Sequence, residues 1–289
     1  MHYSKATLIR CFLFALWCLA FFAYAESPLQ LLGEYIGFAF LGIVGAIFAN
    51  STGAGGGVIF VPFFSQLGLD NTTIVATSFA IQCFGMTAGA LSWFLWFKKE
   101  KKSDVEWQPL YRVLLLTVPF SIAGIWWVQI VDWQSPNSLH ATFGAFSVVL
   151  ALAIFASIPL LKNSQFSRYL TGLDNCFLPV IALLGGGITA WLSVGVGELI
   201  AIYLIFRRFN VSFAIASAVI LSAFSVWAGV LYHIMQSGAV YWAIVLFAGL
   251  GAVIGGSIAR FVVLYFSVTR LKLFFAGWVL LIGIASLPL

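Results

Sequence analysis

The stretch "FANSTGAGGGVIFVPFF", Phe48 to Phe64, sets three polar residues, four glycines and a proline inside a region that is otherwise apolar. Glycine allows backbone angles that other residues disfavour, and proline lacks the N–H that a helix interior uses. The stretch therefore predicts a break between two helices. The composition of the whole chain indicates the surroundings of that break.

The chain has 289 residues, of which 62% are hydrophobic and 8% charged, and its mean hydropathy is +1.06. A soluble domain does not have this composition. Apolar runs near the roughly 18 to 20 residues that cross a bilayer recur along the sequence. We predict an all-α polytopic membrane protein with about 8–10 membrane segments and a signal-like N-terminal helix. The predicted segments are 9–24, 32–49, 58–67, 74–97, 110–131, 138–161, 173–192, 199–206, 211–234, 240–259 and 271–287.

The glycine-rich stretch divides a region too long for one membrane helix. A continuous helix over residues 32–67 would be about 54 Å long, nearly twice the roughly 30 Å of bilayer hydrocarbon. After the break, about ten residues remain, and a helix of about 15 Å covers only half of that thickness. Unwound backbone at membrane depth is tolerated where it is buried in protein or lines a watery cavity. The break therefore predicts a cavity.

The same block occurs a second time. A shift of 140 residues aligns "GAGGGVIFVPFFSQLGLDNTTIVATSF" from Gly53 with "SVGVGELIAIYLIFRRFNVSFAIASAV" from Ser193. Gly55 then matches Gly195, and Gly57 matches Gly197. Small residues are common in membrane helices and match by chance, but here the order of long and short segments also recurs. We predict two related transmembrane repeats, residues 31–161 and 173–287, after the segment 1–26.

The basic residues predict how the two repeats are oriented. If each short segment is a crossing, each repeat has five crossings and the repeats are inverted, and all 14 Lys and Arg residues fall on the cytoplasmic side. If each broken unit is one crossing, the repeats are parallel and seven basic residues fall outside: Lys5, Arg10, Arg207, Arg208, Arg260, Arg270 and Lys272. The count favours the inverted repeat, with a re-entrant half-helix left open in each repeat.

Inverted repeats with paired, glycine-interrupted segments are typical of secondary transporters, which hold substrate between the interruptions. The N-terminus of a half-helix presents free N–H groups and a positive dipole end, which suit an anion. The alternative for Ser and Thr is a bond to their own helix, and for glycine a helix contact. The candidate substrate-binding residues are Asn50, Ser51, Thr52, Gly53, Gly55, Gly56, Gly57, Thr77, Ser78, Ser193, Gly195, Gly197 and Ser217.

Glu198 takes the place of Val58 in the second repeat and is the acidic residue at a break. An ionisable side chain at membrane depth is costly and indicates function, here proton coupling or cation binding. Two alternatives stay open. Glu198 lies near the outer interface in contact with water, or it caps its own short helix.

Few residues indicate catalysis or a cofactor. The four cysteines form no CxxC pair, and the three histidines are scattered. We expect no enzyme, no metal site and no cofactor. Lys5 and Arg10 precede an apolar core that ends in "AYAES", which is typical of a secretory cleavage site, so residues 1–26 are either a cleaved signal or a retained first helix.

"GAGGGVIFVPFFSQLG", the following "VATS", their repeat in the second half and "DVEW" from Asp104 resemble the TauE/SafE family of membrane permeases, the sulfite exporters. The resemblance covers nearly all of the chain after residue 30. It implies a multi-pass transporter of the bacterial inner membrane that moves sulfur-containing anions such as sulfite or organosulfonates. Family members are described with about eight spans, fewer than the ten segments counted above. The second repeat departs from the pattern, because "SVGVGELIAIYLIF" lacks one glycine of the "GGG" run and the proline, with Ile202 in the place of Pro62 and Glu198 in the place of Val58.

The expected function is therefore permease activity by alternating access, with coupling to protons as one form of it. The alternatives are an anion channel or facilitator without ion coupling, and a transporter of another small organic anion. The expected partners are a small anionic substrate and the lipid bilayer. A second copy of the chain is left open, and no nucleic acid is expected.

Overall fold

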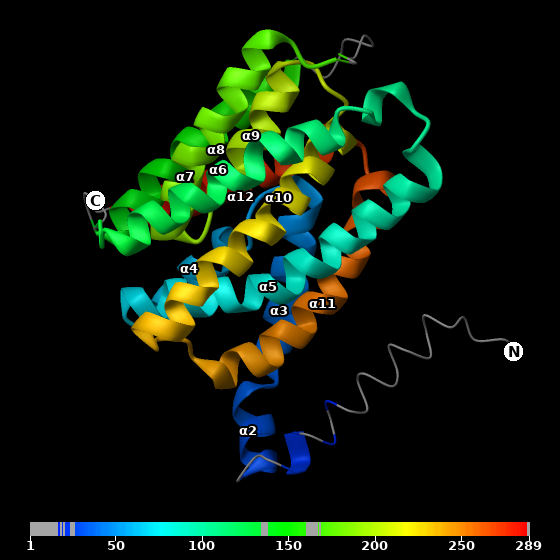
Figure 1. Ribbon diagram of the computed structural model, residues 1–289. Coiled ribbons are helices and arrows are strands. Elements are labelled where there is room, and N and C mark those ends of the chain that lie inside the picture. The colour runs from blue at the N-terminus through cyan, green and yellow to red at the C-terminus, as the bar shows by residue number, and fades with distance from the viewer. Residues whose placement is uncertain are drawn as a thin grey trace, which may run out of the picture. The chain divides into compact units, whose positions relative to one another are not determined.

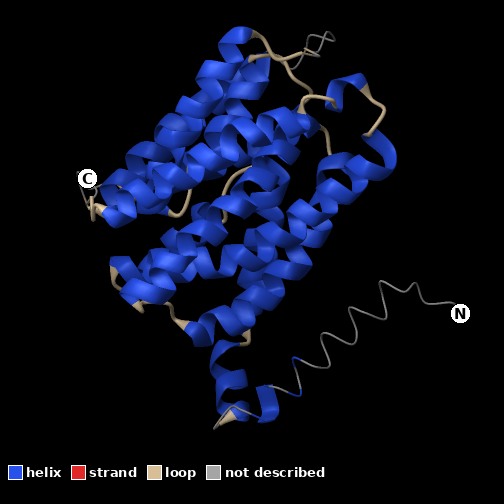
Figure 2. Ribbon diagram, in the orientation of Figure 1, coloured by secondary structure: helices blue, strands red, loops and turns tan. Residues whose placement is uncertain are grey.

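The computed structural model describes residues 27–133, 138–159 and 169–287, together with residues 17, 19, 21–23 and 167. Most of these residues are helical, and no strand occurs among them (Figure 2). The chain divides into two units, residues 1–37 and 38–289. The first contains helix α2 (Pro28–Tyr35). The prediction for residues 1–26 falls almost wholly outside the described residues.

The second unit contains the first predicted repeat from residue 38 onward and all of the second, and the order of the helices recurs (Figure 1). Each repeat has a long helix, a short helix and three more long helices. In the first repeat these are α3 (Gly37–Thr52), α4 (Gly57–Gln66), α5 (Asn71–Trp96), α6 (Leu110–Ile130) and α7 (Leu139–Ser157). In the second they are α8 (Gly172–Leu192), α9 (Val196–Phe206), α10 (Val211–Tyr232), α11 (Trp242–Tyr265) and α12 (Val268–Ala285). Short helical turns η1 (Phe97–Lys101), η2 (Val105–Trp107) and η4 (His233–Ser237) follow α5, precede α6 and follow α10.

The helices have the lengths that a membrane protein requires. Within the described residues, six are long and apolar enough to cross a bilayer: Asn71–Lys101, Val105–Ile130, Leu139–Ser157, Gly172–Leu192, Val211–Ser237 and Trp242–Tyr265. Helices α2 and α3 qualify as one further span when they are taken together. Helices α4 and α9 and the segment Lys272–Ala285 of α12 are apolar but shorter.

Equivalent residues start the third helix of each repeat. The side chain of Asp70 accepts hydrogen bonds from the N–H groups of Thr72 and Thr73, both at 3.0 Å, and caps α5. Asn210, 140 residues later, accepts from the N–H of Ser212 at 2.9 Å and caps α10. Such residues satisfy N–H groups that the first turn of a helix leaves free.

Helix α5 packs against α10 and α11, α6 packs against α8, and α7 packs against α12 (Figure 1). Glycine permits two of the closest approaches. Gly251 of α11 lies against the backbone carbonyl of Ala39 on α3, and Gly186 of α8 lies against that of Ser121 on α6. A side chain at either position would collide with backbone. Each repeat thus packs one helix closely on the other repeat.

Polar contacts join several helix ends. Arg207 after α9 pairs with Asp174 at the start of α8, Nε to Oδ1, at 2.7 Å. Asn210 before α10 donates to Glu106 before α6 at 2.9 Å. Arg260 in the last turns of α11 donates to Ser92 near the end of α5 at 3.1 Å, and Lys272 near the start of α12 donates to Ser157 at the end of α7 at 3.2 Å. With the short connections between helices, these contacts gather the starts of α6, α8, α10 and α12 with the ends of α5, α7, α9 and α11. We call this the basic end of the second unit.

Candidate functional site

The two helix breaks, residues 53–56 and 193–195, contact each other. A Cβ atom added to Gly57 would lie 2.5 Å from the carbonyl oxygen of Ser193. A Cβ atom added to Gly197 would lie 2.5 Å from the carbonyl oxygen of Gly53. Because Gly53 matches Ser193 and Gly57 matches Gly197 in the repeat, this is one contact made twice with the repeats exchanged.

The backbone turns in the same way at the start of each break. Gly53 has a φ of 80° and Ser193 a φ of 58°, which are left-handed conformations that stop α3 and α8. Glycine adopts them easily, whereas serine does so at some cost. The second break also contains Gly195 with a φ of 146°, which L-residues rarely adopt. The glycines of this region therefore have a conformational as well as a packing role.

Glu198 connects the two breaks. One carboxylate oxygen, Oε1, accepts a hydrogen bond from the N–H of Gly55 in the first break at 2.7 Å. The other, Oε2, accepts from the N–H of Gly195 in the second at 2.9 Å. The side chain is 3% exposed. Glu198 does cap its own short helix, as one alternative proposed, and it also binds the other repeat. Hydrogen bonds to an ionised acceptor are stronger than neutral ones.

Gln82 of α5 makes a second connection, and the sequence interpretation missed it. Its Oε1 accepts from the N–H of Gly56 at 2.7 Å. Its Nε2 lies within hydrogen-bonding distance of the carbonyl oxygen and the hydroxyl of Ser193, at 3.0 and 2.7 Å, and of the Ser78 hydroxyl at 3.1 Å. Ser193 in turn donates to Ser78 at 2.9 Å. A glutamine in the middle of an apolar segment was the available signal.

Side chains also satisfy two further N–H groups of the breaks. Ala54 donates to the hydroxyl of Thr52 at 3.3 Å, and Val196 donates to the hydroxyl of Thr189 at 2.9 Å. The N–H groups of residues 54, 55, 56, 195 and 196 thus all have partners within the protein. Buried backbone donors need such partners. These five donors, at the helix ends that the sequence assigned to a substrate anion, are used here by the protein itself, and two of them bind the Glu198 carboxylate.

Four other predicted residues lie around these breaks in different roles. Asn50 donates to the carbonyls of Ala46 at 2.8 Å and of Gly85 on α5 at 3.3 Å. Ser51 donates to the carbonyl of Ala259 at 3.3 Å. Thr77 accepts from the N–H of Tyr241, before α11, at 3.0 Å, and the buried hydroxyl of Ser217 has no partner among the described residues. Ser78, Ser193 and the six predicted glycines lie where the breaks meet.

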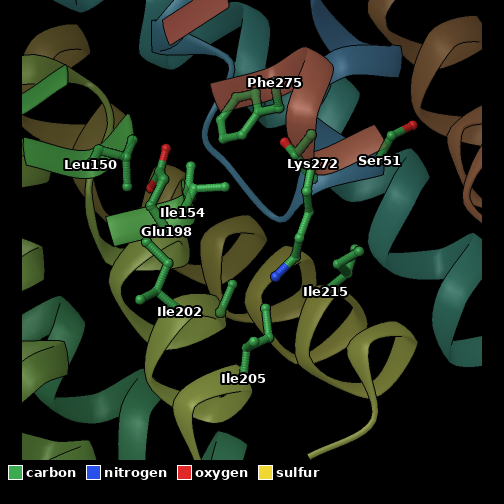
Figure 3. A pocket seen from close by; sticks show the side chains of 11 residues that line it. Ser51, Leu150, Ile154, Glu198, Ile202, Ile205, Ile215, Lys272 and Phe275 are labelled. Atoms are coloured by element: carbon green, nitrogen blue, oxygen red, sulfur yellow. The ribbon is translucent and has the colours of Figure 1, made fainter. Parts of the chain in front are cut away.

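A pocket of about 30 Å³ opens beside the breaks toward the basic end (Figure 3). We call it the lysine pocket. Its polar lining consists of Ser51, Thr52, Glu198 and Lys272, and the rest is aliphatic or aromatic. Figure 3 shows Lys272 extending from α12 into the pocket. The sequence interpretation counted Lys272 as a cytoplasmic charge and did not assign it to the site.

A second pocket of about 270 Å³ lies at the opposite helix ends. Its lining comes from the starts of α5 and α7 and the ends of α6, α8 and α10, and it includes Trp133, Trp191, Gln129 and His233. We call it the tryptophan pocket. A small cavity between the two pockets is lined by Gly55, Gln82, Ser193 and Glu198. The hydrogen-bonded breaks therefore separate the two pockets.

The described residues contain no group of three or more His, Cys, Asp or Glu side chains suited to a metal ion. Among known families, the sequence model described as "Sulfite exporter TauE/SafE" matches residues 38–286. The match spans both repeats and both breaks. No curated protein matches the chain, and no solved structure does.

Proposed function

Because the chain belongs to the sulfite exporter TauE/SafE family, a family of membrane transporters, we propose that it is a secondary permease for small anions. The substrates are sulfur-containing anions such as sulfite or organosulfonates. The protein acts in the bacterial inner membrane. It moves its substrate by alternating access, with the paired breaks as the central gate.

The observation that carries this proposal is the bond pattern of Glu198, whose carboxylate holds one N–H from each break. These N–H groups suit an anion, and the Glu198 carboxylate is an anion that belongs to the protein itself. A substrate anion reaches them when Glu198 moves away. A proton on Glu198 removes its charge and weakens its hold on both groups, because a neutral carboxyl is a poorer acceptor. Proton binding and substrate binding are coupled in this way.

Helix direction supports the inverted arrangement of the repeats. Helix α5 ends at the basic end, where its equivalent α10 begins. Helix α7 ends there as well, and its equivalent α12 begins there. Equivalent helices therefore run in opposite directions relative to this end. By the positive-inside rule the basic end faces the cytoplasm. The lysine pocket then opens to the cytoplasm and the tryptophan pocket to the outside.

The closed state of the breaks fits a carrier and not a pore that is open to both sides at once. The lysine pocket has room for about two waters, since a water needs roughly 10–15 Å³ of such space. The cavity between the two pockets, at about 10 Å³, is smaller still. Passage of an anion thus requires the breaks to rearrange, which is the condition for alternating access.

Flux of radiolabelled sulfite, sulfate and methanesulfonate into proteoliposomes tests this function. We expect saturable uptake of sulfite that follows an imposed pH gradient, and loss of the gradient's effect in Glu198→Gln. Glu34→Gln, at an exposed site in α2, is the matched control and retains the wild-type response. Absence of flux above that of empty liposomes for all three anions contradicts the proposal. Saturable flux that ignores the gradient contradicts the coupling alone.

A further inference from the structure

The lysine pocket contains a cation, Lys272, that forms no direct ion pair within the described part of the chain. The Nζ of Lys272 donates to the hydroxyl of Ser157 at 3.2 Å, and within the described residues this is its hydrogen-bond partner. An ammonium group has three N–H donors, so two stay available. A charged group away from bulk water is costly unless it is paired.

Among the described residues, the other polar groups of the pocket make their hydrogen bonds elsewhere and none bonds directly to Lys272. The carboxylate of Glu198 is engaged by the N–H groups of Gly55 and Gly195. The hydroxyl of Ser51 donates to the carbonyl of Ala259, and that of Thr52 donates to the carbonyl of Phe48 at 2.9 Å. Lys272 is therefore the side chain that offers free donors and a positive charge to a ligand.

The walls define which anion suits this charge. They are formed mainly by Leu150, Ile154, Ile202, Ile205, Ile215 and Phe275. One ammonium group compensates one negative charge, and the nearby carboxylate of Glu198 repels a second. An apolar group on the ligand is stabilised against the aliphatic walls, by about 0.8 kcal/mol per buried methylene.

We propose that the lysine pocket is a binding site for a small monovalent anion that carries an apolar group, with Lys272 as its counter-charge. The inference rests on the proposed function, since it makes the pocket the cytoplasmic stage of the anion path. It adds to that function one residue that binds the anion, Lys272, and a selectivity for anions with a single negative charge over anions with two. The present volume of the pocket holds only water, so the pocket must widen to accept such a ligand.

Binding is measured without transport, by equilibrium dialysis of radiolabelled methanesulfonate against the purified full chain in detergent. Propane-1-sulfonate, acetate and sulfate are the competitors. We expect propane-1-sulfonate to bind more tightly than methanesulfonate, by up to about fourfold per methylene. Acetate competes, and sulfate is the weakest competitor of the set. Sulfate that competes as well as methanesulfonate overturns the charge selectivity.

Variants test the role of the lysine. Lys272→Met weakens methanesulfonate binding by about tenfold to a hundredfold, as expected for the loss of a hydrogen bond to a charged group. Lys272→Arg retains the charge and most of the binding. Arg270→Met, two residues earlier and exposed, is the matched control and binds like the wild type. Melting temperatures of all variants confirm that they are folded. Unchanged binding in folded Lys272→Met overturns the inference.

The binding and transport results separate the two proposals. Methanesulfonate binding that depends on Lys272, in a protein that moves no anion in liposomes, supports the site and contradicts the permease function. Saturable sulfite transport together with binding that is indifferent to Lys272 supports the function and overturns the site.

Discussion

Glu198 of the second repeat accepts a hydrogen bond from the backbone N–H of Gly55 in the first repeat, 143 residues earlier, at 2.7 Å. The same carboxylate binds Gly195 in its own repeat. One side chain thus bonds to both helix breaks, as Gln82 also does through Gly56 and Ser193.

Replacement of Glu198 by glutamine is expected to lower stability. The glutamine amide has one acceptor oxygen, so only one of the two backbone N–H groups keeps an acceptor. The other N–H faces the NH₂ group of the glutamine, which is itself a donor. The expected loss is about 1–3 kcal/mol, the usual cost of an unsatisfied buried group. It is measured as a fall in melting temperature in detergent, with Glu34→Gln as the control. An unchanged melting temperature contradicts a structural role for these two bonds.

Gln82→Leu is expected to destabilise the contact between the breaks from the side of α5. The substitution leaves the N–H of Gly56 and the carbonyl of Ser193 without their partner. We expect a loss of about 1–3 kcal/mol or more, since both groups are buried. Gln66→Leu, at the exposed end of α4, is the control. Equal melting temperatures for the two variants count against the assigned bonds.

The reciprocal glycines predict equal sensitivity in the two repeats. Gly57→Ala and Gly197→Ala each place a methyl group against a backbone carbonyl. Overpacking of this kind costs about 1–3 kcal/mol, and we expect both variants to lose stability and transport. Gly277→Ala in α12 meets nothing within 4 Å. It is expected to gain up to about 1 kcal/mol from helix propensity. A tolerated alanine at 57 or 197 contradicts the close contact there.

Inversion of the repeats predicts opposite sidedness for equivalent positions. Gln66 and Phe206 are 140 residues apart and exposed at the ends of α4 and α9. After replacement of the native cysteines, a cysteine at 66 is expected to react with a membrane-impermeant thiol reagent in intact cells. A cysteine at 206 reacts in inverted vesicles instead. Labelling of both from the same side means that the repeats are parallel.

The cap of α5 predicts a pH-dependent contribution to stability. Hydrogen bonds from the side chain and backbone N–H of Thr73 lower the pKa of the Asp70 carboxyl below its ordinary value. A lowered pKa in the folded state means that the stabilisation is complete above the ordinary value and is lost as pH falls through the folded value. Asp70→Ala is expected to cost about 0.5–2 kcal/mol at neutral pH. Asp70→Asn retains the cap without the pH dependence, and melting curves between acid and neutral pH compare the three proteins. Equal acid sensitivity in Asp70→Asn and wild type contradicts this assignment.

The helices were largely predictable because apolar runs fix them. The short helix after the first break was expected at residues 58–67 and spans Gly57–Gln66. The 140-residue shift also indicated that the second break would copy the first, and Gly53 and Ser193 do share a left-handed backbone. The helix α2 was not predicted, because residues 28–35 continue into the next apolar segment without a strong breaker.

The site was predicted only in part, because its bonds depend on tertiary contacts. Gly55, Gly195 and Glu198 were identified by their positions in the repeat. Gln82 is matched in the second repeat by Ser222, a different polar residue, and its partner Ser193 is 111 residues away in sequence. Lys272 looks like any basic residue near a helix start. Its entry into the pocket depends on the packing of α12 against α7, which no local pattern encodes.

Counterflow tests the central claim most directly. The claim is that the protein is a carrier whose paired breaks open alternately to the two sides of the membrane. Proteoliposomes are loaded with unlabelled sulfite and diluted into buffer with a trace of labelled sulfite. A carrier exchanges the two, and we predict a transient accumulation of label above its equilibrium level that Gly197→Ala abolishes and Gly277→Ala retains. A monotonic rise to equilibrium, as a channel gives, or no uptake at all, would contradict the account.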